Sequence, residues 1–564
     1  MTPTDQIYSL DDTPVLPVTL LLGLQHVCIA AIAFVFPVLL VRFMGGSAAQ
    51  TQFMVSMSMM AGGVGVILQA LRPGPVGSGY LCPTVCGPSF LAASMLCVKS
   101  GGLSLVLGMT LVAGTAEALF SRVLNRIRVL FPPEITGVIV AMVGLSMIRV
   151  AGMNLMGMEG GDFDRDAALA GLLTLLVMIG LNVWAGGRIK MFSILLGMAA
   201  GYAISISMGL LTLDQIRQGL DAPWVWFPFA HHPGWDFSWA MVLPVVVAML
   251  CSSLKSIGDL TTCQKMNTPG WTRPDMENMK QGILADGLAC CAAGLLGGMG
   301  QSTSSTNIGL AMATGAVSRV IAFAMGGIMI ALAFFPKLSG IFAVMPAPVI
   351  GATLVFALSF MVTAGFQIVM SRMLDARKTF IIGLSIIFGL MVDVIPQAFE
   401  GFPDWIQPVF ASSLSVSTVV AVVLNLIFRI GIRSTAELEL ECGPGASQAI
   451  FDFFEGQGRA WAARAEVIRK AASAVNEYAE LFSRQNPGET LDVRVAFDEL
   501  NLKVEIRHAG RGPELPQRAP IPEEMISDPG LLDELGGYLV RSYADRVKVR
   551  FREGRTVTRL GFEH

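Results

Sequence analysis

Residues 80–98, YLCPTVCGPSFLAASMLCV, and residues 301–315, QSTSSTNIGLAMATG, are the two apolar stretches that decide the fold of this chain. The first is interrupted by Pro83 and Gly87, and the second opens with a run of Ser and Thr before Asn307. Membrane transporters built from inverted repeats carry such interrupted segments at equivalent positions of their two halves, where they form the binding site. The places of the two stretches among the apolar segments therefore determine the expected architecture.

The composition is that of an integral membrane protein. Of the 564 residues, 53% are hydrophobic and only 14% are charged, whereas soluble domains carry about 25% charged residues. The net charge is −3 and the sequence has no basic stripe, so nucleic acid is not an expected partner. Because the acidic first residues lack the basic start of a secretory signal, we expect the first apolar segment to be retained as a span.

Fourteen apolar segments recur along the chain, and most are long enough to cross a hydrocarbon core of about 30 Å. They are residues 17–41, 54–71, 80–97, 102–120, 134–152, 167–185, 191–211, 239–260, 281–298, 303–315, 318–335, 346–366, 379–396 and 411–428. The two interrupted stretches are the third and the tenth, which are equivalent positions in two halves of seven. The sequence therefore predicts an all-α polytopic membrane protein with 7+7 inverted repeats.

Basic residues in the expected connections favour one orientation. With the N-terminus inside, thirteen Lys and Arg residues fall in cytoplasmic connections and six fall on the opposite side. The thirteen are Arg72, Arg122, Arg126, Arg128, Arg188, Lys190, Lys265, Arg273, Lys280, Arg319, Arg372, Arg377 and Lys378. The six are Arg42, Lys99, Arg149, Arg165, Arg217 and Lys337. Because cytoplasmic loops carry the excess of Lys and Arg, we expect a multi-pass protein of the cell membrane with both termini in the cytoplasm.

The eighth segment ends in SSLKSIGDLTT, residues 252–262, with Lys255 and Asp259 one helical turn apart. A charge within a bilayer costs several kcal/mol, so such residues face a protein interior or a water-filled site. Three interpretations of Lys255 stay open. It pairs with Asp259 within the helix, it bridges to Asp286 on the ninth segment, or it reads the charge of an anionic substrate.

The tenth segment contains TNIGLAMATG, which places Asn307, Gly309, Thr314 and Gly315 in the pattern Asn-x-Gly-x-x-x-x-Thr-Gly. Six further stretches accompany it in order along the chain: GLQHV (23–27), PTVCGPSF (83–90), LFPPEITGVIVAMVGLSM (130–147), SIGD (256–259), ADGL (285–288) and PKLSGIFAVMPAPVIGATLVF (336–356). Together they resemble the nucleobase–ascorbate transporter family, also called nucleobase:cation symporter-2, which includes xanthine and uracil permeases. The resemblance covers about residues 15–430.

The resemblance implies a core domain and a gate domain that move nucleobases by alternating access, with the substrate between the third and tenth segments and the eighth alongside. It implies a transporter rather than an enzyme, without a cofactor, with a proton or cation as a co-transported ion and with a homodimeric assembly in the bilayer. The expected substrate-binding residues are Phe90, Lys255, Asp259, Ser305, Thr306 and Asn307. The expected coupling or gating residues are His26 and Asp286, for which a purely structural hydrogen bond is the alternative.

Two positions depart from the family pattern. Lys255 stands where the uracil and xanthine carriers have a Glu, and Thr306 stands where a carboxylate or amide often precedes the signature Asn. A lysine together with two half-helix N-termini favours an anion, so we expect a xanthine-, uracil- or urate-type purine or pyrimidine that is carried as an anion, and a small non-nucleobase anion is the alternative. Glu117 is expected near a helix end beside Arg122, in a structural role.

The chain changes character after about residue 434. We divide it into an N-terminal cytoplasmic segment (1–16), a transmembrane domain (17–433), a linker (434–458) and a soluble α+β domain (459–564). The last of these begins with an amphipathic helix and continues with four stretches of alternating apolar and polar residues, as strands do. Those stretches are LDVRVAF (491–497), NLKVEIRHAG (501–510), DRVKVRF (545–551) and TVTRLGF (556–562).

The C-terminal domain weakly resembles the ATP-binding domain of histidine kinases and anti-sigma-factor kinases, but its nucleotide motifs are damaged. Glu477 is in place, whereas Leu481 stands at the metal-binding Asn and His508 stands at the adenine-binding Asp. We therefore expect a regulatory or docking domain without catalysis. A nucleobase sensor that signals through this domain is a second hypothesis, and an active membrane-anchored kinase is a third. No metal is expected, because Cys82 and Cys86 have no His or further Cys at ligand spacing.

Overall fold

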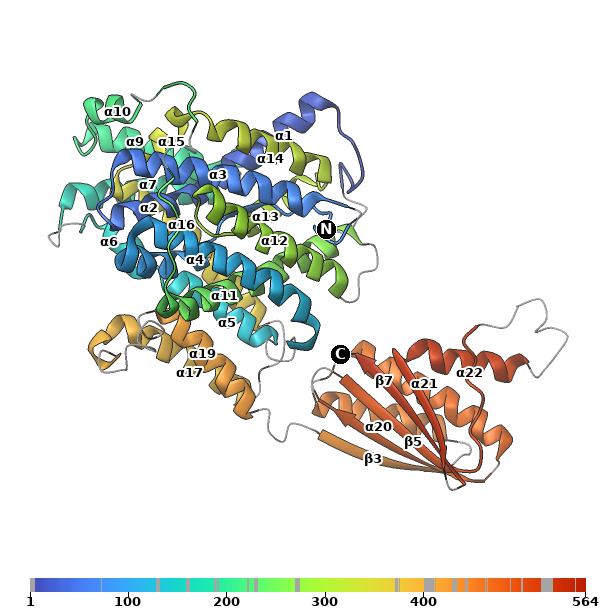
Figure 1. Cartoon of the computed structure of the whole chain (residues 1–564). Helices are drawn as coiled ribbons and strands as arrows, with labels where there is room; N and C mark the ends of the chain where they lie inside the picture. Colours follow the sequence, from blue (N-terminus) through green and yellow to red (C-terminus); the bar gives the residue numbers. More distant parts are fainter. Residues whose placement is uncertain are drawn as a thin grey trace. The chain divides into compact units, whose positions relative to one another are not determined.

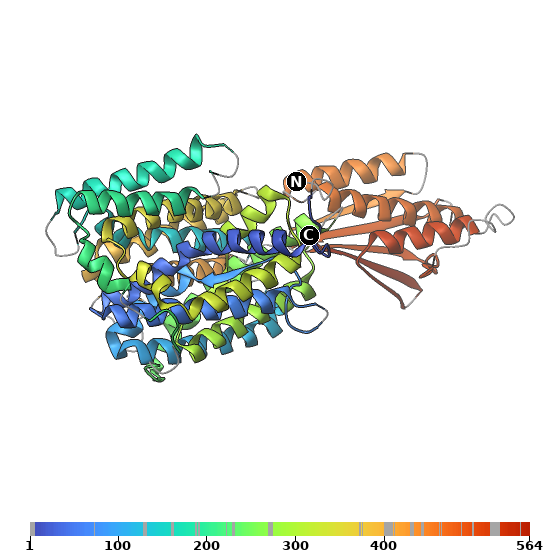
Figure 2. The same cartoon turned by 90° about the horizontal axis from the view of Figure 1, so that it is seen from above.

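The structure is a computed structural model that divides the chain into two compact units, Met1–Asn425 and Leu426–His564. It describes residues 6–563 apart from 73, 128–131, 159–162, 187–188, 190–191, 221–222, 228–231, 269–273, 371–373, 375, 400–409, 411, 429–433, 442–444, 462, 464, 487, 499–500, 519–530 and 553. Five of the basic residues used to orient the chain lie outside this description: Arg128, Arg188, Lys190, Arg273 and Arg372. The first unit is a bundle of long helices, and the second is a sheet covered by helices (Figures 1 and 2).

Every expected span of the first half coincides with a described element. Spans one to seven are α1 (Leu16–Ala30) with η2 (Ala31–Phe34) and α2 (Val35–Phe43); α3 (Ala48–Ala70); β1 (Thr84–Cys86) with η3 (Pro88–Phe90) and the start of α4 (Leu91–Ile127); the rest of α4; α5 (Pro133–Leu145) with α6 (Ile148–Leu155); α7 (Arg165–Val183); and α9 (Ser193–Ser207). Spans three and four meet within α4 at Gly101 and Gly102, where Gly102 has φ +70°. The left-handed conformation, which glycine adopts readily, breaks the helix there.

The second half repeats this order. After α10 (Leu213–Leu220), spans eight to fourteen are α11 (Trp239–Asn267); α12 (Met276–Leu296); β2 (Gln301–Thr303) with α13 (Ser305–Thr314); α14 (Arg319–Ala333) with α15 (Pro336–Ala343); α16 (Ala347–Val369); α17 (Ala376–Val394) with η6 (Pro396–Phe399); and α19 (Ser413–Phe428). Within the described residues, eight helices are long and apolar enough to cross a membrane alone, or up to nine if α14 and α15, bent by 82°, form one span. Of the other spans, α17 is long enough but carries Arg377, Lys378 and Asp393, and the rest are broken or short.

The helices of the first unit form two packing groups, each drawn from both halves of the chain. In one group α4 packs on α11 and α12, and α3 packs on α12 and α14. In the other, α16 packs on α5, α6 and α7, while α17 packs on α5. The first group contains both interrupted spans and corresponds to the expected core domain, and the second corresponds to the gate domain.

The third and tenth spans meet as a short antiparallel pair of strands. Val85 lies opposite Ser302, with Thr84 opposite Thr303 and Cys86 opposite Gln301. The backbone groups of these extended segments are satisfied by each other, since extended chain is tolerated at membrane depth only where protein covers it. All six residues are buried. The pair fixes the starts of the two following helices beside one another.

Small residues let α4 and α12 approach closely. A Cβ placed on Gly114 would lie 2.5 Å from the backbone nitrogen of Cys291, and one on Gly287 would lie 2.7 Å from that of Ala118. Helices in membranes associate through such seams of small residues, which bring the backbones into van der Waals contact. The interface between α4 and α12 is therefore tightly packed.

The N-terminal segment is attached to the connection between spans ten and eleven. Tyr8 forms a parallel bridge with Ala316, and the Ser318 hydroxyl donates a hydrogen bond of 2.6 Å to the Asp12 carbonyl. Arg319 and Asp11 form an ion pair of 2.9 Å. The start of the chain thus lies on the same side of the bundle as the beginning of α14.

The second unit is a five-stranded antiparallel sheet in the order β3-β4-β5-β7-β6 with three helices on one face (Figures 1 and 2). The strands are β3 (Ser434–Glu441), β4 (Thr490–Phe497), β5 (Asn501–Ala509), β6 (Arg546–Arg552) and β7 (Arg555–Glu563), and the helices are α20 (Ala446–Ala460), α21 (Ala465–Gln485) and α22 (Leu531–Tyr543). The alternating stretches therefore form strands β4 to β7, as predicted.

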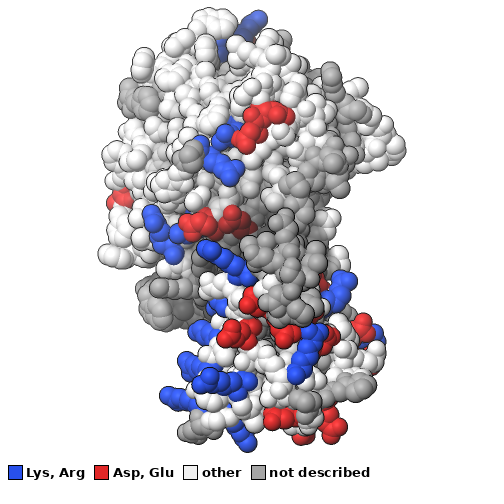
Figure 3. Space-filling model, turned by 90° about the vertical axis from the view of Figure 1, so that its right-hand side faces the viewer, with Lys and Arg blue, Asp and Glu red and all other residues white. Residues whose placement is uncertain are grey.

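The structure corrects the expected linker at 434–458. Within that range β3 pairs along its length with β4, from Ser434 opposite Phe497 to Glu441 opposite Thr490, and α20 buries Ile450 and Phe454 in the core of the unit. The sequence did not reveal β3 as a strand. It lies at the edge of the sheet, and Leu440 is its only fully buried residue, so its apolar side is weakly marked. On the face drawn in Figure 3, charged side chains are dense on this unit and sparser on the first unit.

Candidate functional site

The candidate site lies where β2 passes into α13, beside the middle of α11. Ser304 caps α13 and accepts a hydrogen bond from the backbone N–H of Asn307. Hydroxyl side chains are favoured at such N-cap positions because they satisfy free helix N–H groups. The run of Ser and Thr in the tenth segment therefore ends the strand, starts the half-helix and supplies polar groups within the membrane domain.

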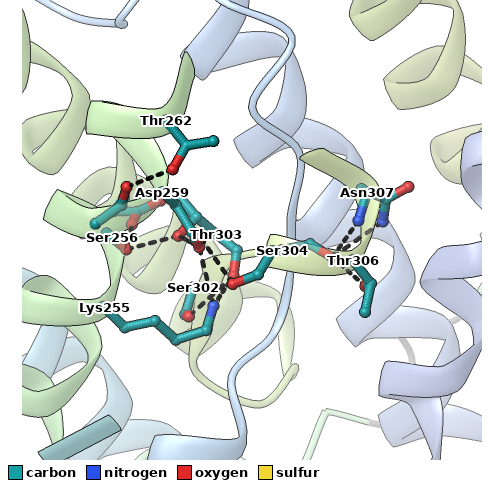
Figure 4. A network of polar contacts seen from close by, with 12 residues as sticks. Lys255, Ser256, Asp259, Thr262, Ser302, Thr303, Ser304, Thr306 and Asn307 are labelled. Atoms are coloured by element: carbon teal, nitrogen blue, oxygen red, sulfur yellow. Dashed lines mark hydrogen bonds and ion pairs between the residues drawn. The ribbon is translucent and has the colours of Figure 1, made fainter. Parts of the chain in front are cut away.

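Lys255 and Asp259 form a buried ion pair on α11. The Nζ atom of Lys255 lies 3.1 Å from Oδ2 of Asp259, and the exposed fractions of the two side chains are 9% and 11%. Lys255 also donates a hydrogen bond to the Thr303 carbonyl oxygen of β2. The ammonium thus links the eighth span to the interrupted tenth span (Figure 4). The intrahelical pairing has the geometry of the first interpretation of Lys255, and no direct ion pair with Asp286 accompanies it among the described residues.

Asp259 collects three donors from two spans. Besides Lys255, it accepts hydrogen bonds from the hydroxyls of Thr303, at 2.6 Å, and Ser305, at 2.7 Å. Charge-assisted hydrogen bonds of this kind are short and strong. The carboxylate is therefore held as a charged acceptor at the N-terminal end of α13 (Figure 4).

Asp286 on α12 extends the network away from this end of α13. It accepts hydrogen bonds from the Ser256 hydroxyl and, at 3.2 Å, from the Gln69 side-chain amide. Ser256 Oγ lies 3.0 Å from Thr303 Oγ1, which donates to Asp259. A chain of side chains therefore connects Asp286 with the Lys255–Asp259 pair.

His26 and Asn307 connect α1 to the other side of α13. Both are buried, and the Asn307 side-chain oxygen lies 2.9 Å from Nδ1 of His26. Since an amide oxygen can only accept, His26 carries its hydrogen on Nδ1. The Asn307 amide nitrogen donates to Ser304 Oγ at 3.1 Å, and that hydroxyl lies 3.0 Å from Thr306 Oγ1. His26 therefore positions the signature asparagine.

Phe90, an expected substrate-binding residue, lies in η3 at the start of the other half-helix. Its N–H donates to the Gly87 carbonyl at 3.1 Å, so this group is engaged within the turn and is not offered to a ligand. Its ring covers Gly300, where a Cβ would lie 2.6 Å from the ring carbon Cγ. Phe90 thus contributes its ring, and the neighbouring hydroxyl of Ser89 has no hydrogen-bond partner in the described part of the chain.

Hydrogen bonds and ion pairs place the expected site residues other than Phe90 in two networks. Lys255, Asp259, Ser305 and Asp286 belong to one, and His26, Thr306 and Asn307 belong to the other. Sequence reasoning missed Ser256 and Gln69, which hold Asp286, and Ser253, which holds Glu117. A signal existed for Gln69 and Glu117, since polar residues within an apolar span mark buried partners. Glu117 was wrongly placed near a helix end, because α4 continues to Ile127 and buries Glu117 completely. Its Oε1 accepts a hydrogen bond of 2.7 Å from Ser253 on α11.

The damaged nucleotide motifs of the C-terminal unit form part of its core. His508 is buried, and its Nε2 lies 2.9 Å from the Tyr478 hydroxyl, which in turn lies 2.9 Å from Thr558 Oγ1. Burial raises the pKa of Tyr478 to about 12. Leu481 is also buried. These side chains are committed to packing. Among the described residues, no group of three or more His, Cys, Asp or Glu side chains is arranged to hold a metal ion.

Comparison with known proteins assigns the membrane unit. The xanthine/uracil permease model, described as Permease family, matches residues 18–398. The chain belongs to this family. It is 30% identical to xanthine permease XanP of Escherichia coli (strain K12) over an alignment of 442 residues that covers 75% of this chain and 95% of XanP. It is also 30% identical to xanthine permease XanQ of the same strain, over 76% of this chain and 95% of XanQ.

The fold also matches a solved transporter of low sequence similarity. Murine Solute Carrier 26 family member A9, an anion transporter in the inward-facing state, superposes with a TM-score of 0.52 at 10% identity, covering 76% of this chain and 71% of that one. Such a likeness shows the fold alone. The chain is therefore a polytopic membrane permease with 7+7 inverted repeats, as the two interrupted segments predicted.

Proposed function

We propose that this permease transports a purine nucleobase across the cell membrane, with the substrate held between the ring of Phe90 and the polar groups of α11 and α13. The observation that carries this proposal is the cluster at the point where the interrupted spans meet, in which the buried Lys255, Asp259 and Thr303 are bonded to one another and Asp259 also accepts from the exposed Ser305. Family membership supports it, because the similar proteins include xanthine permeases XanP and XanQ and the nucleobase transporter PlUacP of Paenibacillus larvae.

The chemistry of the cluster suits the edge of a planar base. A purine presents several N–H donors and carbonyl or ring-nitrogen acceptors along its edge. Asp259 is an acceptor, Lys255 is a donor, and the hydroxyls of Ser305 and Thr306 can do either. An aromatic ring such as that of Phe90 packs on the face of the base. Because the Lys255–Asp259 pair is neutral overall, the site can bind a neutral purine. An anionic purine can in addition compete with Asp259 for the ammonium group of Lys255, which favours the anion.

Transport into proteoliposomes tests the proposal. Labelled xanthine, urate and uracil would be offered at pH 5.5 and pH 7.5 to the native protein and to Lys255→Gln. We expect saturable uptake of at least one purine by the native protein. We expect Lys255→Gln to lower the kcat/KM for urate at least tenfold more than that for uncharged uracil, because only the anion loses a charged partner.

Lys255→Gln is preferable to Lys255→Glu, which would place two carboxylates side by side with Asp259. Lys280→Gln is the matched control, since Lys280 forms an exposed pair with Glu277 and should not affect any substrate. Absence of uptake for all three bases by folded native protein would contradict nucleobase transport. Equal losses for urate and uracil in Lys255→Gln would contradict charge reading and leave Lys255 as a structural residue.

We further propose that both termini are cytoplasmic and that the permease works as a homodimer in the bilayer. Contacts among the connections support the orientation. The Gln6 amide donates to the Met266 carbonyl and Arg319 pairs with Asp11, so the N-terminal segment meets two connections expected inside. On the expected outer side, Arg42 donates to the carbonyl of Ala343. Accessibility of single cysteines to membrane-impermeant reagents would test the orientation.

A further inference from the structure

Glu117 is a buried acid that the substrate site does not use. Its side chain is completely buried in α4, and Oε1 accepts a hydrogen bond from Ser253 on α11. The second oxygen, Oε2, is buried without a partner at hydrogen-bond distance among the described residues; the Cys290 thiol, which interacts with this carboxyl group, donates to the Gln301 carbonyl at 3.0 Å. Buried carboxylates are ordinarily paired or fully hydrogen-bonded, because an isolated buried charge is very unfavourable. This acid therefore needs a ligand for its free oxygen.

Among the described residues, no Lys, Arg or His side chain forms an ion pair with Glu117. The titratable groups on α12 that face it are Asp286, Cys290 and Cys291, and none of them can bear a positive charge. On α11 the lysine is already engaged by Asp259 and Thr303. Two further elements pack on α4. They are η3, which has no titratable residue, and α2, whose Arg42 donates to the Ala343 carbonyl. A proton is the cation that a site of this size and donor set fits.

Helix packing closes Glu117 off from water. The α4–α12 seam brings Gly114 and Gly287 into backbone contact, and Ser253 is itself fully buried. An ionised Glu117 would be strongly destabilised in this dry interface, whereas the protonated acid is neutral. Protonation and deprotonation of Glu117 would therefore change how stably α4, α11 and α12 pack together. Of these helices, α11 carries the substrate-site residues Lys255 and Asp259.

We propose that Glu117 is the proton-binding residue that couples substrate movement to the proton gradient in this chain. A proton binds at Oε2 from the side of higher proton concentration, forming the neutral acid. It leaves again as H⁺ to the opposite side after the core domain has moved. Ser253 is a positioning residue, because its hydroxyl holds Oε1 and links the acid to α11, two residues before Lys255. This inference rests on the transport function proposed above and adds the identity of the coupling site.

Two transport assays on the full-length Glu117→Gln protein in proteoliposomes test the proposal. The first is xanthine counterflow at equal pH on both sides, which needs only movement of the loaded carrier. The second is xanthine accumulation driven by an inward proton gradient. We expect counterflow within about twofold of native, while accumulation falls to simple equilibration, because glutamine keeps the hydrogen bond but cannot bind the proton. Glu277→Gln, an exposed acid, is the control and should behave as native.

The outcomes separate this inference from the proposed function. Gradient-driven accumulation that survives in Glu117→Gln would overturn the role of Glu117. Counterflow by the native protein without any response to the pH gradient would also overturn it, and would leave nucleobase transport standing. Lack of both activities in folded native protein would instead remove the proposed function. If Glu117→Gln does not fold, Glu117→Asp decides: a displaced pH profile of accumulation supports the proposal, and an unchanged profile contradicts it.

Discussion

At the scale of single residues, the membrane domain concentrates charge at a few buried positions with defined partners. Lys255 has Asp259 and a backbone carbonyl of β2, Asp259 has two hydroxyls as well, and Asp286 has Ser256 and Gln69. Buried ion pairs contribute little net stability, since desolvation offsets the attraction. We infer that these side chains serve the function of the protein. Their partners offset the free-energy cost of burying charged and polar groups.

The first residue-scale prediction concerns the cost of separating the Lys255–Asp259 pair. Lys255→Met alone should lower the free energy of unfolding by about 3–5 kcal/mol, because it leaves a buried carboxylate without its counter-charge. Lys255→Met combined with Asp259→Asn should recover most of that loss, since asparagine is neutral and still accepts hydrogen bonds. Unfolding in mixed micelles with increasing SDS would measure the full double-mutant cycle.

The exposed pair of Lys280 and Glu277, with Nζ 3.1 Å from Oε1, provides the matched cycle. Its coupling energy should not exceed about 1 kcal/mol, as is usual for solvent-exposed pairs. If the coupling energies of the two pairs are equal, the Lys255–Asp259 pair does not experience a dry environment and the assignment of a buried cluster is wrong.

At the scale of elements, the interrupted spans depend on close contact between a strand and a ring. Gly300 precedes β2, and any side chain at this position would meet the Phe90 ring. The Gly87 N–H donates to the Gly300 carbonyl at 2.8 Å, so the backbone there has no freedom to move away. Gly300, in the second seven-span repeat, therefore sets the orientation of the Phe90 ring, which belongs to the first repeat and which the substrate would contact.

We predict that Gly300→Ala weakens substrate affinity on the order of tenfold while the protein stays folded, because the added methyl group displaces a ring that positions the ligand. The KM for xanthine uptake and the thermal midpoint in detergent would be measured together. Gly327→Ala on α14, where a Cβ meets no atom within 4 Å, is the matched substitution and should leave the KM unchanged. An unaltered KM in Gly300→Ala would exclude Phe90 from the substrate site.

At the scale of the whole molecule, the chain consists of a permease unit and a separately packed C-terminal unit. The boundary lies between Asn425 and Leu426, within the last turn of α19 and a few residues before the change in composition at about residue 434. The C-terminal unit has its own core built around Phe454, Tyr478 and Phe482. Since its nucleotide motifs are filled by packed side chains, we expect it to act by docking or regulation rather than by turning over ATP.

Removing this unit tests whether it is needed for transport. A chain ending at Phe428 should take up xanthine at an initial rate within about twofold of the full chain, because the expected site residues all lie in the permease unit. A chain ending at Leu440 is the informative comparison. It retains most of β3 without its partner β4, and an unpaired strand edge promotes aggregation. Loss of uptake by folded protein ending at Phe428 would make the C-terminal unit part of the transport machinery.

The sequence by itself determined the class of fold, the number of spans and the family. Hydrophobic length reports bilayer crossing directly. The clustering of Pro83 with Gly87, and the polar Ser/Thr run at the start of the tenth segment, indicated interrupted spans at equivalent positions of the two halves. It also marked Lys255, Asp259, Asp286 and Asn307, because a polar residue in an apolar span must have a partner. These are local properties that can be read along the chain.

Only the tertiary structure decided who those partners are. The pairing of Thr303 with Asp259, of Ser253 with Glu117 and of His26 with Asn307 joins residues between 44 and 281 positions apart. Serine and threonine are common in helices for many reasons, so nothing local distinguishes a hydroxyl that holds a carboxylate from one bonded to its own helix. The strand β3 was missed for the same reason: its buried side is defined by contact with β4 and α20, and that contact exists only once the chain has folded.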